Sequence, residues 1–394
     1  MVNNDNGIWV FLSHSNRDFE RVRILRNLLE ENGFRPIMLY LRSKENPSKV
    51  EELRQLIYDE IDHRNRFIYC KSPNAEASTW VDEEIQYIKS TNRIFETIDI
   101  EQSEEEIIEQ LNDFRKKSNI FISYQRDDFE LAKSIANRLK KYEFNVWIDF
   151  ENLQSGVFFD HIKNALLNAV NNGYVITLLN DGILNPNSLV RAEMINALQN
   201  GKHYEQSIIP VIKDSLLWNK LVNDVELESL CKINPIDSSS FEPEQQSDYI
   251  VDEIIKRILP HGAILSHARN FESGFYGYTD IEEAKRLYSI CFQIAEYQER
   301  MGSNTGDGVL GYCYEHGYGT EQNLGLAIDY YREAAKYFPE YQEHFKRLSH
   351  QLYGSGEMKS HNDNGVWQED NGNPSSSSKM RLNFLQRLKS IFKK

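Results

Sequence analysis

The start of the chain alternates short apolar runs with longer segments in which apolar side chains recur at helical spacing. Residues 8–12 form an unbroken apolar run, which predicts a buried strand. Residues 19–32 carry apolar side chains three and four positions apart, which predicts a helix, and Gly33 is suited to end it. Further strands are then expected at residues 34–40 and 66–70, and further helices at residues 50–63 and 79–89. Strands that alternate with helices predict a parallel sheet with helices on both faces.

The same pattern restarts near residue 118. Ser13 and Ser123 end the first strands of the two series and are 110 positions apart. Glu84 and Glu193 lie on corresponding helices and are 109 positions apart. Because the offset is nearly constant, the sequence indicates a duplication. Later strands of the second series are expected at residues 144–149, 174–179 and 207–212, with helices at 129–142 and 188–199. We therefore expect two flavodoxin-like parallel-sheet α/β domains in tandem, at residues 7–117 and 118–259.

Beyond residue 260 the strand pattern stops, and glycine, alanine and aromatic residues recur at helical periods. Four residues match others 43 positions later, Gly274, Phe275, Ile281 and Ala284 pairing with Gly317, Tyr318, Leu324 and Ala327. A repeat of this length predicts stacked helix pairs, so we expect a small all-α helical repeat module at residues 260–353. Residues 354–378 are rich in asparagine, glycine and serine, which predicts a flexible linker.

The last segment, residues 379–394, has an apolar stripe, basic residues elsewhere and no acidic residue. The stripe contains Met380, Phe384, Leu385, Leu388, Ile391 and Phe392. This pattern predicts a basic amphipathic helix. Such a helix can make a peripheral contact with an anionic membrane or dock in a partner's groove. It can equally dock on this protein's own acidic body or remain a solvated tail.

Composition narrows the class of protein. The chain has 394 residues, enough for two or three domains, and its net charge of −15 opposes binding to nucleic acid. Its four cysteines form no CxxC pair, which favours a reducing, cytoplasmic location. The sequence has no secretion signal and no apolar run long enough to span a membrane. It lacks Walker, GxGxxG and HExxH motifs, so we expect neither a metal site nor a bound cofactor.

Ligands of open parallel α/β sheets bind beyond the carboxyl ends of the strands, so candidate site residues should follow each strand. In the first domain, Ser13 and His14 follow the first strand and Arg42 follows the second. No GxSxG elbow surrounds Ser13, so a Ser-His nucleophile is not expected. His14 is expected to line the crevice or to hydrogen-bond its own turn. In the second domain, Arg126 is expected to meet a pyrophosphate or to form a surface salt bridge.

These strand ends resemble those of a known family. Residues 10–15 (Val-Phe-Leu-Ser-His-Ser) and 120–124 (Ile-Phe-Ile-Ser-Tyr) resemble the opening motif of Toll/interleukin-1 receptor (TIR) domains. Residues 78–84 resemble the SxWxxxE helix start of the family's NAD-cleaving members, and residues 147–156 the loop after the second strand. The resemblance implies a tandem TIR domain protein of bacterial type. The helical region is similar to Sel-one-like repeats, which are tetratricopeptide relatives, at residues 310–314, 317–319 and 334–335.

The TIR resemblance implies a candidate catalytic glutamate in each domain, and it leaves open that one domain is catalytic and the other regulatory. In the first domain it implies Glu84 as the catalytic residue, with Ser13, His14, Arg42, Ser78 and Trp80 as substrate-binding residues. In the second it implies Glu193, with Tyr124, Arg126, Asp149, Glu151 and Gly156 as substrate-binding residues. The second domain departs from the motif, because Leu189 replaces the tryptophan and Asn187 the serine. This departure weakens the case for Glu193.

A physical argument for Glu84 stands beside the resemblance. Ser78 or Thr79 can cap the helix, which places Glu84 near the positive end of the helix dipole and favours the ionised carboxylate. A fixed carboxylate stabilises the oxocarbenium charge that develops when a nicotinamide–ribose bond breaks. Trp80 lies on the same helix face and can stack on a ring or wall the pocket. The alternative is that Glu84 is a solvated helix residue and Trp80 belongs to the core.

Two classes of function follow from the resemblance. The first is an NAD+ glycohydrolase that takes NAD+ as substrate, yields nicotinamide and ADP-ribose or a cyclic form, and acts in bacterial signalling or antiphage defence. Such an enzyme would self-associate through its TIR domains, and the tandem arrangement would raise their effective concentration. The helical repeats would bind a protein partner. The second class is a non-enzymatic signalling adaptor in which both α/β domains mediate protein–protein interaction.

Overall fold

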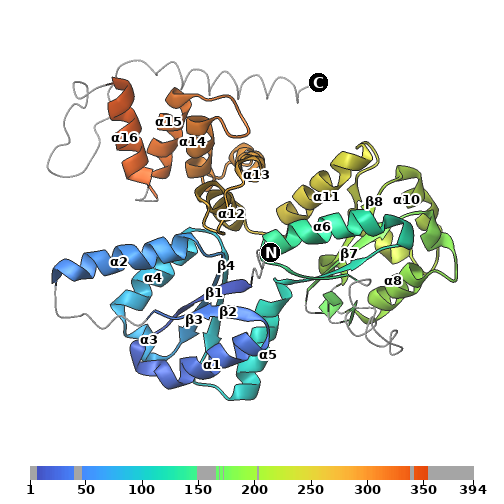
Figure 1. Cartoon of the computed structure of the whole chain (residues 1–394), viewed down its shortest axis with the longest axis horizontal. Helices are drawn as coiled ribbons and strands as arrows, with labels where there is room; N and C mark the ends of the chain where they lie inside the picture. The colour runs from blue at the N-terminus through green and yellow to red at the C-terminus, as the bar shows by residue number, and fades with distance from the viewer. Residues whose placement is uncertain are drawn as a thin grey trace. The chain divides into compact units, whose positions relative to one another are not determined.

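The computed structural model of the chain describes residues 7–39, 47–148, 166–167, 169–171, 173–201, 204–337 and 341–353 (Figure 1). The chain divides into two compact units, residues 1–267 and 268–394. The first unit contains two parallel sheets and the second contains helices. The predicted fold class, two parallel-sheet α/β domains followed by a helical region, is therefore confirmed.

The first sheet has four parallel strands in the order β2-β1-β3-β4. The strands are β1 (Ile8–Ser13), β2 (Phe34–Ile37), β3 (Arg66–Lys71) and β4 (Ile94–Asp99). The helical segments between and after them are η1 (Asn16–Asp18), α1 (Phe19–Glu31), α2 (Pro47–Asp62), α3 (Pro73–Glu76), α4 (Thr79–Ser90) and α5 (Glu104–Lys116). Strand β1 lies inside the sheet and is almost wholly buried. Its carboxyl end lies at the edge of the sheet where ligands of open parallel α/β sheets bind.

The second sheet has five parallel strands in the order β6-β5-β7-β8-β9. The strands are β5 (Asn119–Ser123), β6 (Asn145–Ile148), β7 (Tyr174–Leu179), β8 (Ile208–Ile212) and β9 (Ile236–Asp237). The helical segments are η2 (Arg126–Asp128), α6 (Phe129–Lys141), η4 (Asp181–Leu184), α8 (Leu189–Asn200), α9 (Tyr204–Ser207), α10 (Ser215–Leu221), η5 (Glu228–Lys232) and α11 (Pro243–Ile258). In both sheets the first strand lies between the second and the third, as a duplication requires.

A buried aspartate occupies the same place in both domains. Asp18 accepts hydrogen bonds from Ser72 Oγ at 2.5 Å and from Asn74 Nδ2 at 2.6 Å. Asp128, 110 positions later, accepts one from Asn180 Nδ2 at 2.8 Å and is ion-paired with Lys213. Each aspartate joins the start of a helix to the loop after the third strand. In each domain, the aspartate therefore ties the loop after the third strand to the start of the first helix, and both segments border the carboxyl end of the first strand.

The helical unit repeats a tyrosine–glutamate contact. Tyr288 donates a hydrogen bond to Glu272 at 2.6 Å, and Tyr331 donates one to Glu315 at 2.8 Å. Both members of the second pair follow those of the first by 43 residues, the spacing found in the sequence. The helices are α12 (His261–Ser273), α13 (Ile281–Arg300), α14 (Asp307–His316), α15 (Leu324–Ala334) and α16 (Tyr341–Tyr353). Consecutive helices from α13 to α16 pack against one another.

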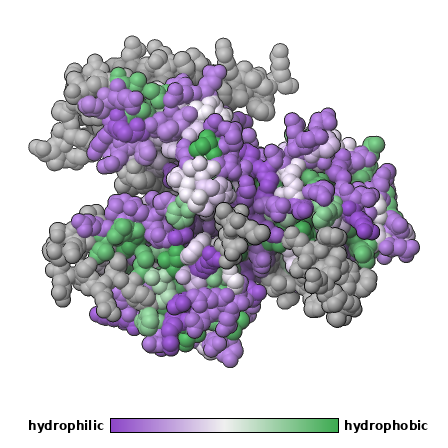
Figure 2. Space-filling model, viewed as in Figure 1, coloured by the Kyte–Doolittle hydropathy of each residue, from purple (hydrophilic) through white to green (hydrophobic). Residues whose placement is uncertain are grey.

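Hydrophilic residues cover most of the face seen in Figure 2, with hydrophobic patches over both α/β domains. Within the described part of the chain, no helix is long and apolar enough to cross a membrane. The predicted linker at 354–378 and the predicted amphipathic helix at 379–394 lie outside the described residues.

Candidate functional site

The first candidate site joins the end of β1 to the inner face of α4. Ser78 caps α4, because its hydroxyl accepts a hydrogen bond from the backbone N–H of Val81 at 3.4 Å. This start directs Glu84 toward the sheet, where Ser13 Oγ donates a hydrogen bond to its Oε2 at 2.6 Å. Ser13 is buried and Glu84 is partly buried, whereas Glu83 is exposed. Glu84 is therefore not the solvated helix residue of the alternative interpretation.

Burial changes the acidity of Glu84. It raises the pKa of the carboxyl group from 4.5 to about 7, and the hydrogen bond from Ser13 lowers the pKa by a smaller amount. The sequence led us to expect an ionised carboxylate held by the helix dipole, and that expectation missed the larger effect. Near neutral pH the group is close to half protonated, which is the range in which a carboxyl group can either accept or donate a proton.

The second domain repeats the pair with the same atoms. Ser123 Oγ donates a hydrogen bond to Glu193 Oε2 at 2.5 Å. Helix α8 is capped by Ser188, whose hydroxyl accepts from the backbone N–H of Arg191 at 3.3 Å. The constant offset pointed to Asn187 in place of the capping serine, but the second domain keeps a serine cap one residue later. Leu189 stands where the first domain has Trp80 and is 51% exposed.

Trp80 belongs partly to the core of the first domain. It packs against the buried cluster of Phe11, Ile57, Ile61, Phe67 and Ile88. The guanidinium carbon of Arg54 lies 5.2 Å from the centroid of its ring. The core alternative for Trp80 thus has direct support, and a role in stacking on a substrate ring stays a prediction.

The remaining predicted residues of the two strand ends differ in their contacts. The ring Nδ1 of His14 lies 2.9 Å from the carbonyl oxygen of Leu12 and donates to it, so His14 hydrogen-bonds its own turn. Burial lowers the pKa of His14, which favours the neutral ring. Tyr124 lies beside Phe129, with 6.2 Å between ring centroids. Arg126 is exposed and makes no ion pair with any residue that the structure describes.

Four predicted site residues fall outside the described part of the chain. They are Arg42, Asp149, Glu151 and Gly156. Among the residues that are described, no group of three or more histidine, cysteine or acidic side chains could hold a metal ion.

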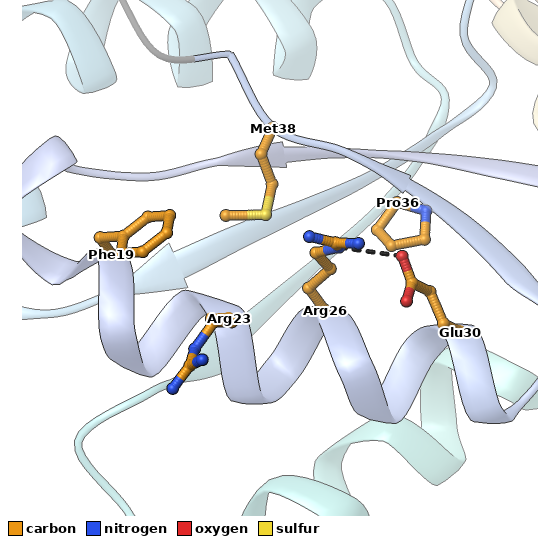
Figure 3. Close-up of a pocket in the computed structure, with 6 residues that line it drawn as sticks. All are labelled: Phe19, Arg23, Arg26, Glu30, Pro36 and Met38. Carbon is orange, nitrogen blue, oxygen red and sulfur yellow. Dashed lines mark hydrogen bonds and ion pairs between the residues drawn. The ribbon is translucent and has the colours of Figure 1, made fainter.

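A surface depression on the first domain is separate from these pairs. It lies between α1 and β2, and Figure 3 shows Arg26 reaching Glu30 beside it, with 2.9 Å between Nε and Oε1. Its lining residues are Phe19, Arg23, Arg26, Glu30, Pro36 and Met38. None of these is a predicted site residue, so the depression adds nothing to the candidate site.

Three contributors to the sites were missed from the sequence. The sequence identifies Ser123 as a strand end and assigns it no role, although its offset from Ser13 marks it as an equivalent position. Ser188 was missed because the two helices start at different distances from their glutamates. Arg54 carries no motif, and its contact with Trp80 depends on how α2 packs against α4.

The two α/β domains share the order of their first strands. Each also has a buried serine that is hydrogen-bonded to a glutamate on a serine-capped helix. The chain is therefore a duplicated α/β protein with two equivalent candidate sites. The family model of the TIR domain matches residues 10–115 and residues 120–248, and the chain belongs to the TIR domain family. A comparison with curated proteins finds no match to the chain. TIR domains serve signal transduction. The chain is therefore a signal-transduction protein with two TIR domains in tandem.

Proposed function

We propose that this chain is an NAD+ glycohydrolase, in which a glutamate of at least one TIR domain assists cleavage of the nicotinamide–ribose bond. The observation that carries the proposal is the Ser13–Glu84 pair, a partly buried carboxyl group at the carboxyl end of the central strand. Burying a carboxyl group without a cation is costly, and groups with strongly raised pKa values gather at functional sites. Glu193 repeats the arrangement in the second domain.

The chemistry requires no cofactor beyond the substrate. The C–N bond between ribose C1′ and nicotinamide breaks, its electron pair neutralises the pyridinium nitrogen, and positive charge develops on the ribose. An ionised Glu84 beside the ribose stabilises that charge electrostatically. Addition of water at C1′ with loss of a proton gives ADP-ribose, and addition of an adenine nitrogen gives a cyclic form.

The wider role we propose is bacterial signalling or antiphage defence. Self-association of TIR domains would complete the site, and the tandem arrangement would supply part of that contact within one chain. The helical unit would bind a protein partner, as helical repeats commonly do, and we propose Sel-one-like repeats for it. The same proposal places the protein in the cytoplasm, with residues 379–394 as a candidate peripheral membrane contact.

A non-enzymatic adaptor is the second candidate. It is favoured by the contacts of Trp80, whose ring packs on the core and under Arg54, and by the exposed Leu189 at the matching position. In this alternative both α/β domains are interaction modules, and the two glutamates contribute only to the fold.

Nicotinamide release by the full chain separates the two functions. The assay would use NAD+ in large excess, with and without a crowding agent that promotes assembly. We expect Glu84→Ala, Glu193→Ala or both to lower the rate by about 100-fold or more, as loss of a preorganised charge does. Asp82→Ala, at an exposed acidic position on the same helix, is the control and should keep the wild-type rate. Absence of release by the wild type in every assembled state would favour the adaptor.

A further inference from the structure

The two serine–glutamate pairs are independent copies of one geometry. Ser13 and Ser123 are the last residues of β1 and β5, and they are 1% and 2% exposed. Each hydroxyl reaches Oε2 of a glutamate about 70 residues later on a separate helix, at 2.6 Å and 2.5 Å. The two domains differ at most neighbouring positions, including Trp80 against Leu189. A contact kept through such differences has a purpose common to both domains.

The direction of the hydrogen bond limits what each serine can do. A serine hydroxyl has one hydrogen, and an ionised carboxylate can only accept. When Glu84 is ionised, Ser13 therefore spends its single hydrogen on the glutamate and has none left to donate to a substrate. Among the described residues, no other side chain or backbone group hydrogen-bonds the carboxyl group of Glu84. The orientation of Glu84 thus depends on one hydroxyl.

We propose that Ser13 and Ser123 are positioning residues for the glutamates, each fixing Oε2 at the end of the first strand so that the second carboxyl oxygen faces the substrate. This inference rests on the proposed NAD+ glycohydrolase function and changes the role of Ser13 from substrate contact to support of the catalytic group. The serine acts twice in this scheme. It restricts the rotamers of the glutamate, and its donated hydrogen favours the ionised carboxylate.

The sheet supplies a matched control beside the second pair. Thr177 lies directly opposite Ser123 in the register of β5 and β7. Its side chain is fully buried, and its hydroxyl has no hydrogen-bond partner among the described residues. Thr177→Val therefore removes a buried hydroxyl next to Ser123 without removing a contact to the glutamate. Any effect of altering a buried hydroxyl at this strand end in general would appear in that variant as well.

The test compares Ser13→Ala and Ser123→Ala with Thr177→Val in the full chain, by nicotinamide release over a range of pH. In the domain whose glutamate variant loses activity, we expect the serine variant to lower kcat by about 10- to 100-fold, because a hydrogen bond to a charged group is lost. KM should change less than about threefold, and the midpoint of the acidic limb should rise by about one pH value. Thr177→Val should match the wild type. An unchanged kcat and midpoint in that serine variant, or an equal loss in Thr177→Val, would overturn the proposal.

An activity-independent readout separates failure of this inference from failure of the proposed function. Infrared titration follows the carboxyl band of Glu84, identified by its loss in Glu84→Gln. Ser13→Ala should move the titration midpoint of that band upward, since the serine bond favours ionisation. A wild type that releases no nicotinamide refutes the glycohydrolase and, with it, a catalytic purpose for the serines. An unmoved band refutes control of Glu84 by Ser13, whether or not the chain is an enzyme.

Discussion

The guanidinium carbon of Arg54 lies 5.2 Å from the centroid of the Trp80 ring, and the same guanidinium donates to Glu83 Oε2 from Nε at 3.1 Å and from Nη2 at 3.0 Å. Arg54 belongs to α2, whereas Trp80 and Glu83 belong to the first turns of α4. This one side chain therefore joins the two helices at the point where α4 starts. Glu84 follows directly, so the contact supports the helix end that carries the candidate catalytic group.

Replacing Arg54 should loosen the start of α4. Arg54→Met keeps an apolar stem and removes both the cation–π contact and the ion pair, for an expected loss of about 1 kcal/mol in local stability. Hydrogen exchange of α4 peptides, followed by mass spectrometry, measures that loss. Arg26→Met is the control, because Arg26 is ion-paired with Glu30 on the surface of α1. Equal changes in local protection for the two variants would contradict a special role of the Trp80 contact.

Glu84 should make the folded chain less stable at high pH. Its pKa is about 7 in the folded state against an ordinary value of 4.5, so between these values the folded chain holds a proton that the unfolded chain has lost. The stability that this group contributes is present below pH 4.5 and is lost as pH rises toward 7. The amide of glutamine does not ionise, so it carries no such penalty at high pH. Glu84→Gln should therefore gain about 1 to 3 kcal/mol over the wild type between pH 5 and pH 8.

Urea unfolding of the two proteins at several pH values measures this difference. The first α/β domain can be followed through its own peptides in hydrogen exchange, because a chain of several domains need not unfold in one step. Glu83→Gln, at the exposed neighbouring position, should show no comparable pH-dependent gain. A difference between Glu84→Gln and the wild type that stays constant from pH 5 to pH 8 would mean that Glu84 is not buried enough to titrate near neutrality.

The sequence predicted the fold class and the duplication because both depend on patterns that repeat. It missed β4, whose residues Ile94–Asp99 mix apolar and polar side chains, and of these only Ile94 and Ile98 are buried. It also missed β9, which is two residues long. Such strands are recognised by the neighbour with which they pair, and pairing is not visible in a single segment.

The candidate site was predictable in its residue types and not in its electrostatics. Motif and offset selected Glu84 and Glu193, but neither could state that Ser13 and Ser123 lie within hydrogen-bond distance of them. The raised pKa of Glu84 follows from desolvation, which depends on the packing of α4 against the sheet. The helix-dipole argument considered only the local chain, and the tertiary environment outweighed it.

The hydroxyls of two tyrosines in the helical unit allow the 43-residue repeat to be tested. Tyr288 and Tyr331 are fully buried, and each donates to a glutamate, Glu272 and Glu315. Glu272 also accepts from Tyr318 at 2.5 Å, and Glu315 from Arg347 at 2.6 Å, so each glutamate keeps a partner when one tyrosine is changed.

Tyr288→Phe and Tyr331→Phe should each destabilise the helical unit by about 1.5 to 3 kcal/mol, because each removes one hydrogen bond to a charged group without leaving a cavity. Hydrogen exchange of α13 and α15 peptides measures the two losses separately. Tyr297→Phe, at a position that is 62% exposed on α13, is the control and should stay within about 0.5 kcal/mol of the wild type. If the two contacts are equivalent members of a repeat, the two buried variants lose similar amounts. A loss confined to one of them would show that only that contact supports the packing of the unit.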